Sequence, residues 1–263
     1  MTEVSRGYAV ALRRKALPFV GAAGFLLLWE LFCRLYQVRS VLLPPPSLIV
    51  GELAQSPLWF AQQTAYTLGI TLAGFMVAAI LGVLFAVVVT EWKLLDRLLF
   101  PLFVALNSVP KVAIAPLCII WFGTGAEPKI AIAFLIAVFA VVIDTILGLR
   151  SVPPDILDLA QSLRGSRWKV LTRIKLQCAL PHLFAGLKVA MSLALVGAIV
   201  GEFVSSQRGL GYVILSAQGM FDTPRVFAAI AILAVLGVVL IELLDFVERL
   251  ALPWHHSAER TTL

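Results

Sequence analysis

Residues Ser151 to Gly186 read SVPPDILDLAQSLRGSRWKVLTRIKLQCALPHLFAG, and the rest of the chain is organised around this stretch. It is the longest polar segment between two apolar spans. Together with Arg150 it carries a dense group of cationic side chains: Arg164, Arg167, Lys169, Arg173 and Lys175. A charged segment of this length between apolar spans is where we expect a soluble partner to bind.

The first half of this segment predicts a short helix. Pro153 and Pro154 end the preceding span, and proline is tolerated in a first helical turn because its missing N–H has no partner there. Asp155 and Asp158 lie near the start, where the helix dipole favours negative charge. Apolar residues recur at i, i+3, i+4 and i+7, which places one apolar stripe on the helix: Ile156, Leu159, Ala160 and Leu163.

The second half predicts a turn and a second helix. Gly165 suits the position after a helix, where only glycine takes the left-handed conformation without steric cost, and Ser166 can cap the next helix. We expect the second helix to end before Leu180-Pro181. Three residues share one side of it: Leu171, Ile174 and Cys178.

The segment resembles the cytoplasmic coupling loop in the membrane subunits of binding-protein-dependent ABC importers. That loop has the pattern Glu-Ala-Ala, three residues, Gly, nine residues, Ile, one residue, Leu-Pro. Here Asp158-Leu159-Ala160 stands for the first triplet and Ile174 lies at the expected distance. Arg164 stands at the glycine position, and Leu176-Gln177 stands for Leu-Pro.

The flanking sequence resembles the nitrate, sulfonate, taurine and bicarbonate branch of the same family over nearly the whole chain. The resemblance implies an all-α integral membrane fold of the type I permease kind, with a two-helix cytoplasmic coupling loop. It also implies passage of a small solute, an anion such as a sulfonate or nitrate, into the cytoplasm. The matching stretches are Leu43 to Pro46, Pro116 to Gly123, Gly148 to Pro154, Ala185 to Leu187, Gly201-Glu202 and Gly209 to Tyr212.

Several partners follow from the resemblance. They are an ABC ATPase dimer that binds ATP and Mg, a second permease subunit as a homodimer, and an extracytoplasmic solute-binding protein. Residues 151–180 would dock on the ATPase, with the apolar stripe seating the helix and the arginines around Gly165 at the rim. The expected coupling residues are Ile156, Asp158, Leu159, Ala160, Leu163, Arg164, Gly165, Ser166 and Ile174.

Composition independently indicates an integral membrane protein. Hydrophobic residues make up 60% of the 263 and charged residues 14%, whereas soluble domains average about 45–50% and 25%. A crossing takes about 20 apolar residues, and we expect six spans, at about 16–36, 66–90, 98–122, 129–149, 183–203 and 226–247. Between the first two, Pro44-Pro45-Pro46 predicts an extended elbow, and Ser47 can cap a short amphipathic helix.

The distribution of basic residues predicts the orientation. The net charge is +6, but Lys and Arg are dispersed among apolar spans, which favours the bilayer over nucleic acid as the partner. Most of them fall on one side if residues 1–15, the loop at 150–182 and residues 248–263 are cytoplasmic. This predicts a multi-pass membrane protein with both termini inside, and the resemblance implies that the membrane is the bacterial inner membrane. A basic start before an apolar run also fits a signal peptide, but a retained first span fits better, because no clear cleavage site follows.

Polar residues within the spans are candidates for the translocation path, because charge in lipid is costly. Lys111 either attracts an anion or has a structural role, in which it snorkels or pairs with Asp144 or Glu202. Its span is kinked by Pro110 and Pro116. Asp144 either faces a cavity or caps a neighbouring helix, and the resemblance gives Glu202 a gating or assembly role near the outer end. The candidate set is Asn107, Ser108, Lys111, Asp144 and Glu202.

Absent motifs argue against catalysis. The sequence has no Gly-Lys dipeptide, so it has no phosphate-cradling loop and needs another subunit for ATP hydrolysis. Its three His and three Cys show no metal spacing, so neither a metal nor a cofactor of its own is expected. Two alternatives stay open: a secondary transporter, which needs midplane ion ligands and often inverted repeats, and an intramembrane enzyme, for which Lys111, Asp144 and Glu202 form no known constellation.

Overall fold

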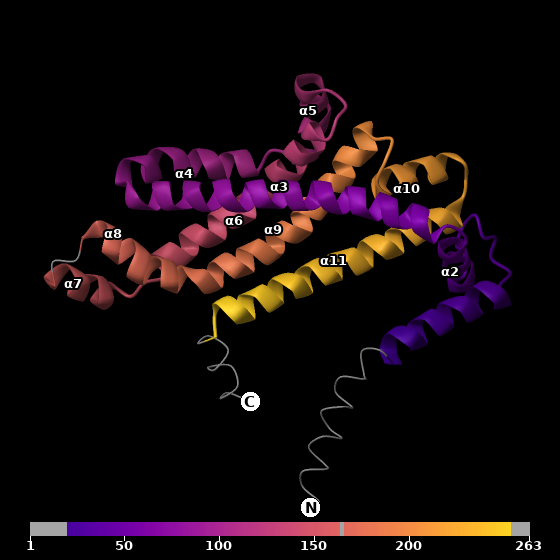
Figure 1. Ribbon diagram of the computed structural model, residues 1–263, viewed down its shortest axis with the longest axis horizontal. Coiled ribbons are helices and arrows are strands. Elements are labelled where there is room, and N and C mark those ends of the chain that lie inside the picture. Colours follow the sequence, from indigo (N-terminus) through magenta and orange to yellow (C-terminus); the bar gives the residue numbers. More distant parts are fainter. Residues whose placement is uncertain (1–19, 164–165, 254–263) are drawn as a thin grey trace, which may run out of the picture. The chain divides into compact units, whose positions relative to one another are not determined.

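The computed structural model describes residues 20–163 and 166–253, and every regular element in these ranges is a helix (Figure 1). The predicted all-α fold is therefore confirmed. In chain order the elements are residues 20–35, α2 (Pro46–Gln55), α3 (Pro57–Glu91), α4 (Lys93–Asn107), η1 (Lys111–Ile114), α5 (Ala115–Phe122), α6 (Glu127–Arg150), α7 (Pro154–Ser162), α8 (Arg167–Val170), η2 (Leu171–Lys175), α9 (Leu176–Ser205), α10 (Leu210–Gly219) and α11 (Thr223–Ala251).

Four helical runs of the described chain are long and apolar enough to cross a membrane. They are Pro57–Glu91, Glu127–Arg150, Arg167–Ser205 and Thr223–Ala251, and each contains one of the predicted spans. The first predicted span, 16–36, begins outside the described residues and is helical over 20–35. The count of six spans therefore stays a prediction.

The predicted span at 98–122 is interrupted, as its prolines indicated. It consists of Lys93–Asn107 and Lys111–Phe122, which are bent by 87° at a short break. The break falls at Pro110, which has no N–H for a helical hydrogen bond and disfavours helical geometry at the residue before it. Pro116, the other expected helix breaker, lies in the first turn of α5, where proline is tolerated.

The chain divides into two compact units, each described by itself. The first consists of Met1–Ala61 with Val213–Ala231, and the second of Gln62–Tyr212 with Ile232–Leu263. Long helices such as α3 and α11 contribute residues to both. Both ends of the 150–182 loop lie in the second unit.

The first unit is held together by polar contacts among short elements. Glu30 accepts hydrogen bonds from the N–H of Ser47 at 3.0 Å and from its hydroxyl at 2.8 Å. Arg225 pairs with Glu52 of α2 at 2.7 Å. The predicted short helix is thus present, but its N-cap residue is Pro45 and no side chain caps it. The expected cap at Ser47 is wrong, because the helix begins at Pro46 and Ser47 therefore lies inside its first turn.

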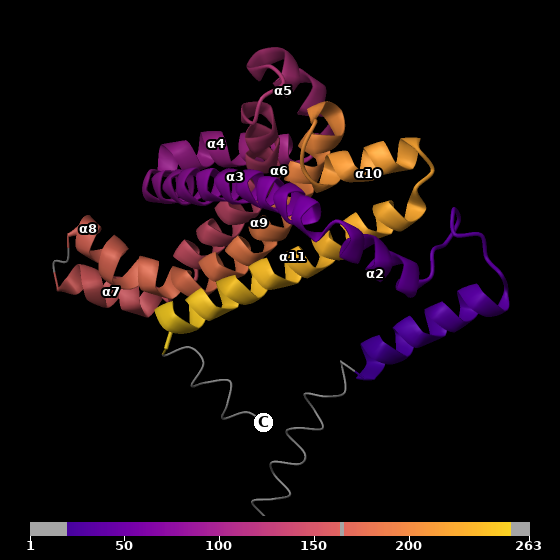
Figure 2. The same ribbon diagram turned by 45° about the vertical axis from the view of Figure 1, so that its right-hand side comes forward.

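The core of the second unit is α6, which packs along α9 and against α3 (Figures 1 and 2). Ala133 of α6 is fully buried. A Cβ added at Gly197 of α9 would lie 2.6 Å from the Cα of Ala133, and one added at Gly74 of α3 would collide with its Cβ. Small residues allow helices in a membrane to approach this closely, where van der Waals packing holds them together.

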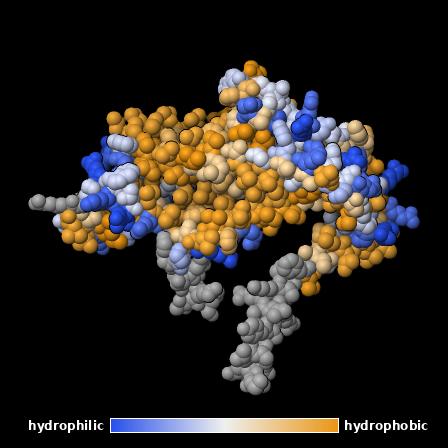
Figure 3. Space-filling view, in the orientation of Figure 1, coloured by the Kyte–Doolittle hydropathy of each residue, from blue (hydrophilic) through white to orange (hydrophobic). Residues whose placement is uncertain are grey.

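The outward faces of α3 and α4 are apolar. Figure 3 shows a continuous hydrophobic surface there, with hydrophilic residues gathered at the α7–α8 end and around α5 at the top of the view. Large exposed side chains include Ile80 and Leu84 of α3 and Leu98 and Leu102 of α4. Such a surface suits hydrocarbon rather than water.

Candidate functional site

The segment quoted first folds into the two predicted helices. α7 begins at Pro154 and ends at Ser162, and α8 begins at Arg167. Ser166 caps α8, because its hydroxyl accepts a hydrogen bond from the N–H of Lys169 at 3.4 Å. Arg164 and Gly165, at the expected turn, lie outside the described residues.

The expected end of the second helix before Leu180-Pro181 is wrong. α8 continues through one π-helical turn, η2, into α9, so the helical run is unbroken from Arg167 to Ser205. Pro181 removes only one backbone hydrogen bond, and membrane helices tolerate this where neighbouring helices support them. Here Gly148 of α6 supports the run, because a Cβ at Gly148 would lie 2.9 Å from the backbone of Ala179.

Most of the predicted coupling residues line one apolar groove of about 260 Å³, which we call the coupling groove. Its described lining is Ile156, Leu159, Ala160, Leu163, Lys169, Val170, Arg173 and Ile174. Leu159 is 60% exposed and Leu163 is 75% exposed, whereas Ala160 is buried. Exposed apolar side chains beside cationic ones are typical of a protein-docking surface rather than of a folded core. Asp158 and Ser166 lie outside the groove lining.

The coupling groove is fixed to the ends of the long helices. Lys175 pairs with Glu91, the last residue of α3, at 2.6 Å, with both side chains about four-fifths buried. Arg150, at the end of α6, pairs with Asp96 of α4 at 2.5 Å. Leu171 packs in a buried cluster with residues of α6 and α9. Lys175 and Leu171 therefore join the helix that carries part of the groove to α3, α6 and α9.

Two of the candidate path residues contact each other. The Lys111 ammonium donates to the backbone oxygen of Asn107 at 2.7 Å and to its side-chain oxygen at 2.6 Å, and it lies 4.6 Å from the ring centre of Phe139. Ser108 is exposed and ends α4. The alternative that pairs Lys111 with Asp144 or Glu202 is wrong, because neither carboxylate bonds to it in the described chain.

Asp144 and Glu202 lie in different parts of the α6–α9 pair. Asp144 faces Gly186, where an added Cβ would lie 2.7 Å from that of Asp144. Glu202 is 1% exposed and accepts hydrogen bonds from the Thr67 hydroxyl at 2.8 Å and from the N–H of Gly211 at 2.7 Å. The five candidate path residues therefore do not form one site.

The Glu202 carboxylate anchors the loop between α9 and α10. The N–H of Leu210 donates to the Thr67 hydroxyl at 2.8 Å, and that of Gly209 donates to Gln63 at 2.7 Å. Gly209 has a φ of 101°, and a Cβ there would collide with the carboxylate of Glu202. Only glycine fits this position without strain. The geometry is that of a structural anchor at the end of the second unit away from the coupling groove.

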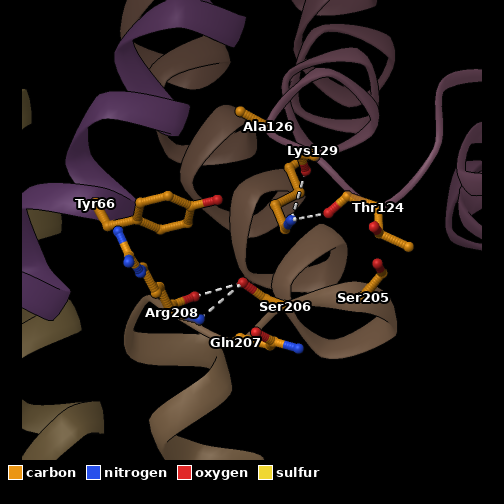
Figure 4. A pocket seen from close by; sticks show the side chains of 9 residues that line it. Tyr66, Thr124, Ala126, Lys129, Ser205, Ser206, Gln207 and Arg208 are labelled. Carbon is orange, nitrogen blue, oxygen red and sulfur yellow. Dashed lines mark hydrogen bonds between the residues drawn. The ribbon is translucent and has the colours of Figure 1, made fainter.

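At the same end lies a polar cavity of about 520 Å³, which we call the outer pocket (Figure 4). Lys129 is 2% exposed, and its ammonium donates to the carbonyls of Gly125 at 2.6 Å and Thr124 at 3.2 Å. The sequence placed Lys129 only at the start of the predicted span 129–149 and did not indicate this pocket. The available signal was a lysine at the very start of an apolar span. The lining residues are Tyr66, Thr124, Gly125, Ala126, Lys129, Ser205, Ser206, Gln207 and Arg208.

Comparisons with known proteins agree on one family. Residues 78–252 match the model described as binding-protein-dependent transport system inner membrane component. A riboflavin transport system permease of Chloroflexus aurantiacus is 35% identical over 94% of both chains. A taurine transport system permease of Escherichia coli is 31% identical over 94% of this chain and 93% of the relative. A putative aliphatic sulfonates permease of Bacillus subtilis is 32% identical over 88% of this chain and 85% of the relative.

A solved structure shares the fold. The methionine ABC transporter MetNI in an inward-facing conformation contains a chain that superposes with a TM-score of 0.66. The match covers 74% of this chain and 97% of that chain, at 15% identity. At this identity the likeness concerns the fold alone.

Proposed function

The chain belongs to the family of binding-protein-dependent transport system inner membrane components, and from this premise we propose that it carries a small anion into the cytoplasm through coupling to its ATPase at the coupling groove. It is a non-catalytic transport permease, and ATP hydrolysis belongs to a separate subunit. ATP and Mg are bound by that ATPase, which acts as a dimer on two copies of this permease.

The observation that carries the proposal is the exposed apolar lining of the coupling groove. Ile156, Leu159 and Leu163 leave large apolar surfaces uncovered on the second unit. These apolar side chains do not face lipid, because the cationic Lys169 and Arg173 lie beside them. Seating each leucine in a partner contributes roughly 1.5–3 kcal/mol. The ion pair between Lys175 and Glu91 then carries motion of the groove to α3.

The proposed orientation follows from the groove. An ATPase is cytoplasmic, so the groove faces the cytoplasm, as do both termini. The outer pocket, at the opposite end of α6 and α9, then faces the extracytoplasmic side, where a solute-binding protein delivers the solute. Span boundaries stay as proposed from the sequence, except at the break near Pro110.

The anion preference rests on two supports. Relatives named for taurine and aliphatic sulfonates resemble this chain over most of its length. The outer pocket is lined by two cations and by no acidic residue. A thermal-shift screen of the cognate binding protein with taurine, methanesulfonate, bicarbonate and riboflavin tests this preference. Stabilisation by riboflavin alone would contradict it.

The docking proposal is tested by replacing Leu159 with Asp. The variant places a charge on the apolar surface and removes a leucine contact, so we expect the ATPase to bind more weakly by about 2 kcal/mol, or about 30-fold. Transport is lost while the subunit still inserts. The measurement is co-purification of the ATPase together with solute uptake.

Arg97→Asp is the control. Arg97 is exposed on α4, outside residues 151–180, and does not line the groove. It should keep both partner binding and uptake. If Leu159→Asp behaves like this control, the groove is not where the ATPase docks.

A further inference from the structure

The outer pocket contains a buried cation that no carboxylate neutralises at close range. The Lys129 ammonium forms two hydrogen bonds, both to backbone carbonyls. None of the ion pairs in the described chain involves Lys129. An ammonium has three donors, so one remains for another acceptor. A buried charge without a counter-ion in direct contact is costly, and an anion in the pocket would offset part of that cost.

The other walls of the pocket also suit an anion. Figure 4 shows the Tyr66 hydroxyl pointing from the opposite wall toward the side of the pocket that holds Lys129. Arg208 adds a second, exposed cation, and Ser205 a further hydroxyl. Hydroxyl and ammonium donors around one cavity match the several acceptors of an oxyanion.

Two carboxylates act on Lys129 from a longer distance, those of Glu127 and Glu202. Neither lines the pocket. Glu202 already accepts hydrogen bonds from Thr67 and Gly211. The carboxylate of Glu127 lies against Gly125 of the lining, so these two acidic groups offset part of the positive charge of Lys129 and Arg208.

We propose that the outer pocket binds the anionic group of the transported solute, a carboxylate, sulfonate or similar oxyanion, with Lys129 as its principal charge. This assignment rests on the proposed function for the identity of the solute, but not for the binding itself. A cavity of about 520 Å³ accommodates a small molecule. An acidic side chain of the binding protein is the competing occupant, and the experiment separates the two.

The experiment uses the assembled transporter with its three native cysteines replaced and Ser205→Cys as a reporter in the pocket wall. Its reaction rates with an anionic and a cationic methanethiosulfonate reagent are compared. Any effect of Lys129 on the reactivity of the thiol itself changes both rates equally, so it cancels in the ratio of the anionic to the cationic rate. We expect a ratio about tenfold in favour of the anionic reagent, because a charged cleft concentrates its counter-ion. Methanesulfonate should slow the reaction, and neutral methanesulfonamide should not.

Lys129→Met should bring this ratio close to one, and Arg208→Gln should lower it less. If the Lys129→Met variant fails to fold, Arg208→Gln still tests the proposal. Lys93→Met, an exposed lysine at the other end of the second unit, is the control and should leave the ratio unchanged. The proposal is overturned if the ratio is near one with Lys129 present, or if the solute-free binding protein protects the reporter and methanesulfonate does not.

This result is independent of the docking test at Leu159. If the reagent ratio fails while Leu159→Asp still releases the ATPase, the importer assignment stands and the pocket assignment falls. If the reverse holds, the pocket remains an anion site and the coupling proposal falls.

Discussion

The ion pair between Glu91 and Lys175 offers the sharpest test of mechanical coupling. Its atoms lie 2.6 Å apart, and the two side chains are 18% and 20% exposed. Lys175→Met leaves Glu91 unpaired in a mostly buried setting. Losing a hydrogen bond to a charged group costs about 1.5–3 kcal/mol, and partial exposure reduces this to about 1–2 kcal/mol. For a chain of this size that corresponds to about 4 °C in Tm.

The assay combines thermal unfolding with transport and ATPase rates in the assembled complex. We expect Lys175→Met to lower Tm and to lower uptake more than ATP hydrolysis, because the groove then moves without α3. The exchanged pair Glu91→Lys with Lys175→Glu should recover most of both. Arg97→Met, an exposed residue without an ion pair in the described chain, should change Tm by less than about 1 °C. An exchanged pair no better than the single variant would refute the reasoning.

One further variant tests the loop between α9 and α10, and another tests the packing of α9 against α11. Gly209→Ala should lower the free energy of unfolding by about 1–3 kcal/mol, because alanine is strained at this φ and its Cβ meets the Glu202 carboxylate; an unchanged Tm would contradict this. Lys188→Met should destabilise by about 1–3 kcal/mol, because Lys188 pairs with both Asp245 and Glu248 of α11. Lys188→Arg should retain most of the stability in the same thermal-unfolding measurement, and equal losses in both variants would show that the charge is not what matters.

Local sequence signals predicted the helices well. Apolar content and periodicity located α3, α6, α9 and α11, and the stripe through Leu159 was correctly assigned to one helix face. Ser166 was correctly expected as a cap. These features depend on neighbours within one or two turns, which the sequence displays directly.

Features that depend on distant residues escaped prediction. Nothing near Glu91 indicates that its partner is Lys175, and nothing near Thr67 indicates Glu202. The continuation through Pro181 was missed because local propensity opposes it, while packing against α6 supports it. Lys129 resembled a boundary residue because a lysine before an apolar run is ordinarily solvated.

The π-helical turn at Leu171–Lys175 determines the direction in which the side chains of α8 point relative to those of α9. A π turn takes one more residue than an α turn, and each residue of a helix advances the side-chain direction by about 100°. The cationic face of α8 is therefore rotated by one residue relative to its position in an uninterrupted α-helix through α8 and α9. Deleting a single residue there would leave the helix intact but would turn the groove residues of α8 to another side of the helix axis. Coupling therefore depends on the length of this turn as well as on its side chains.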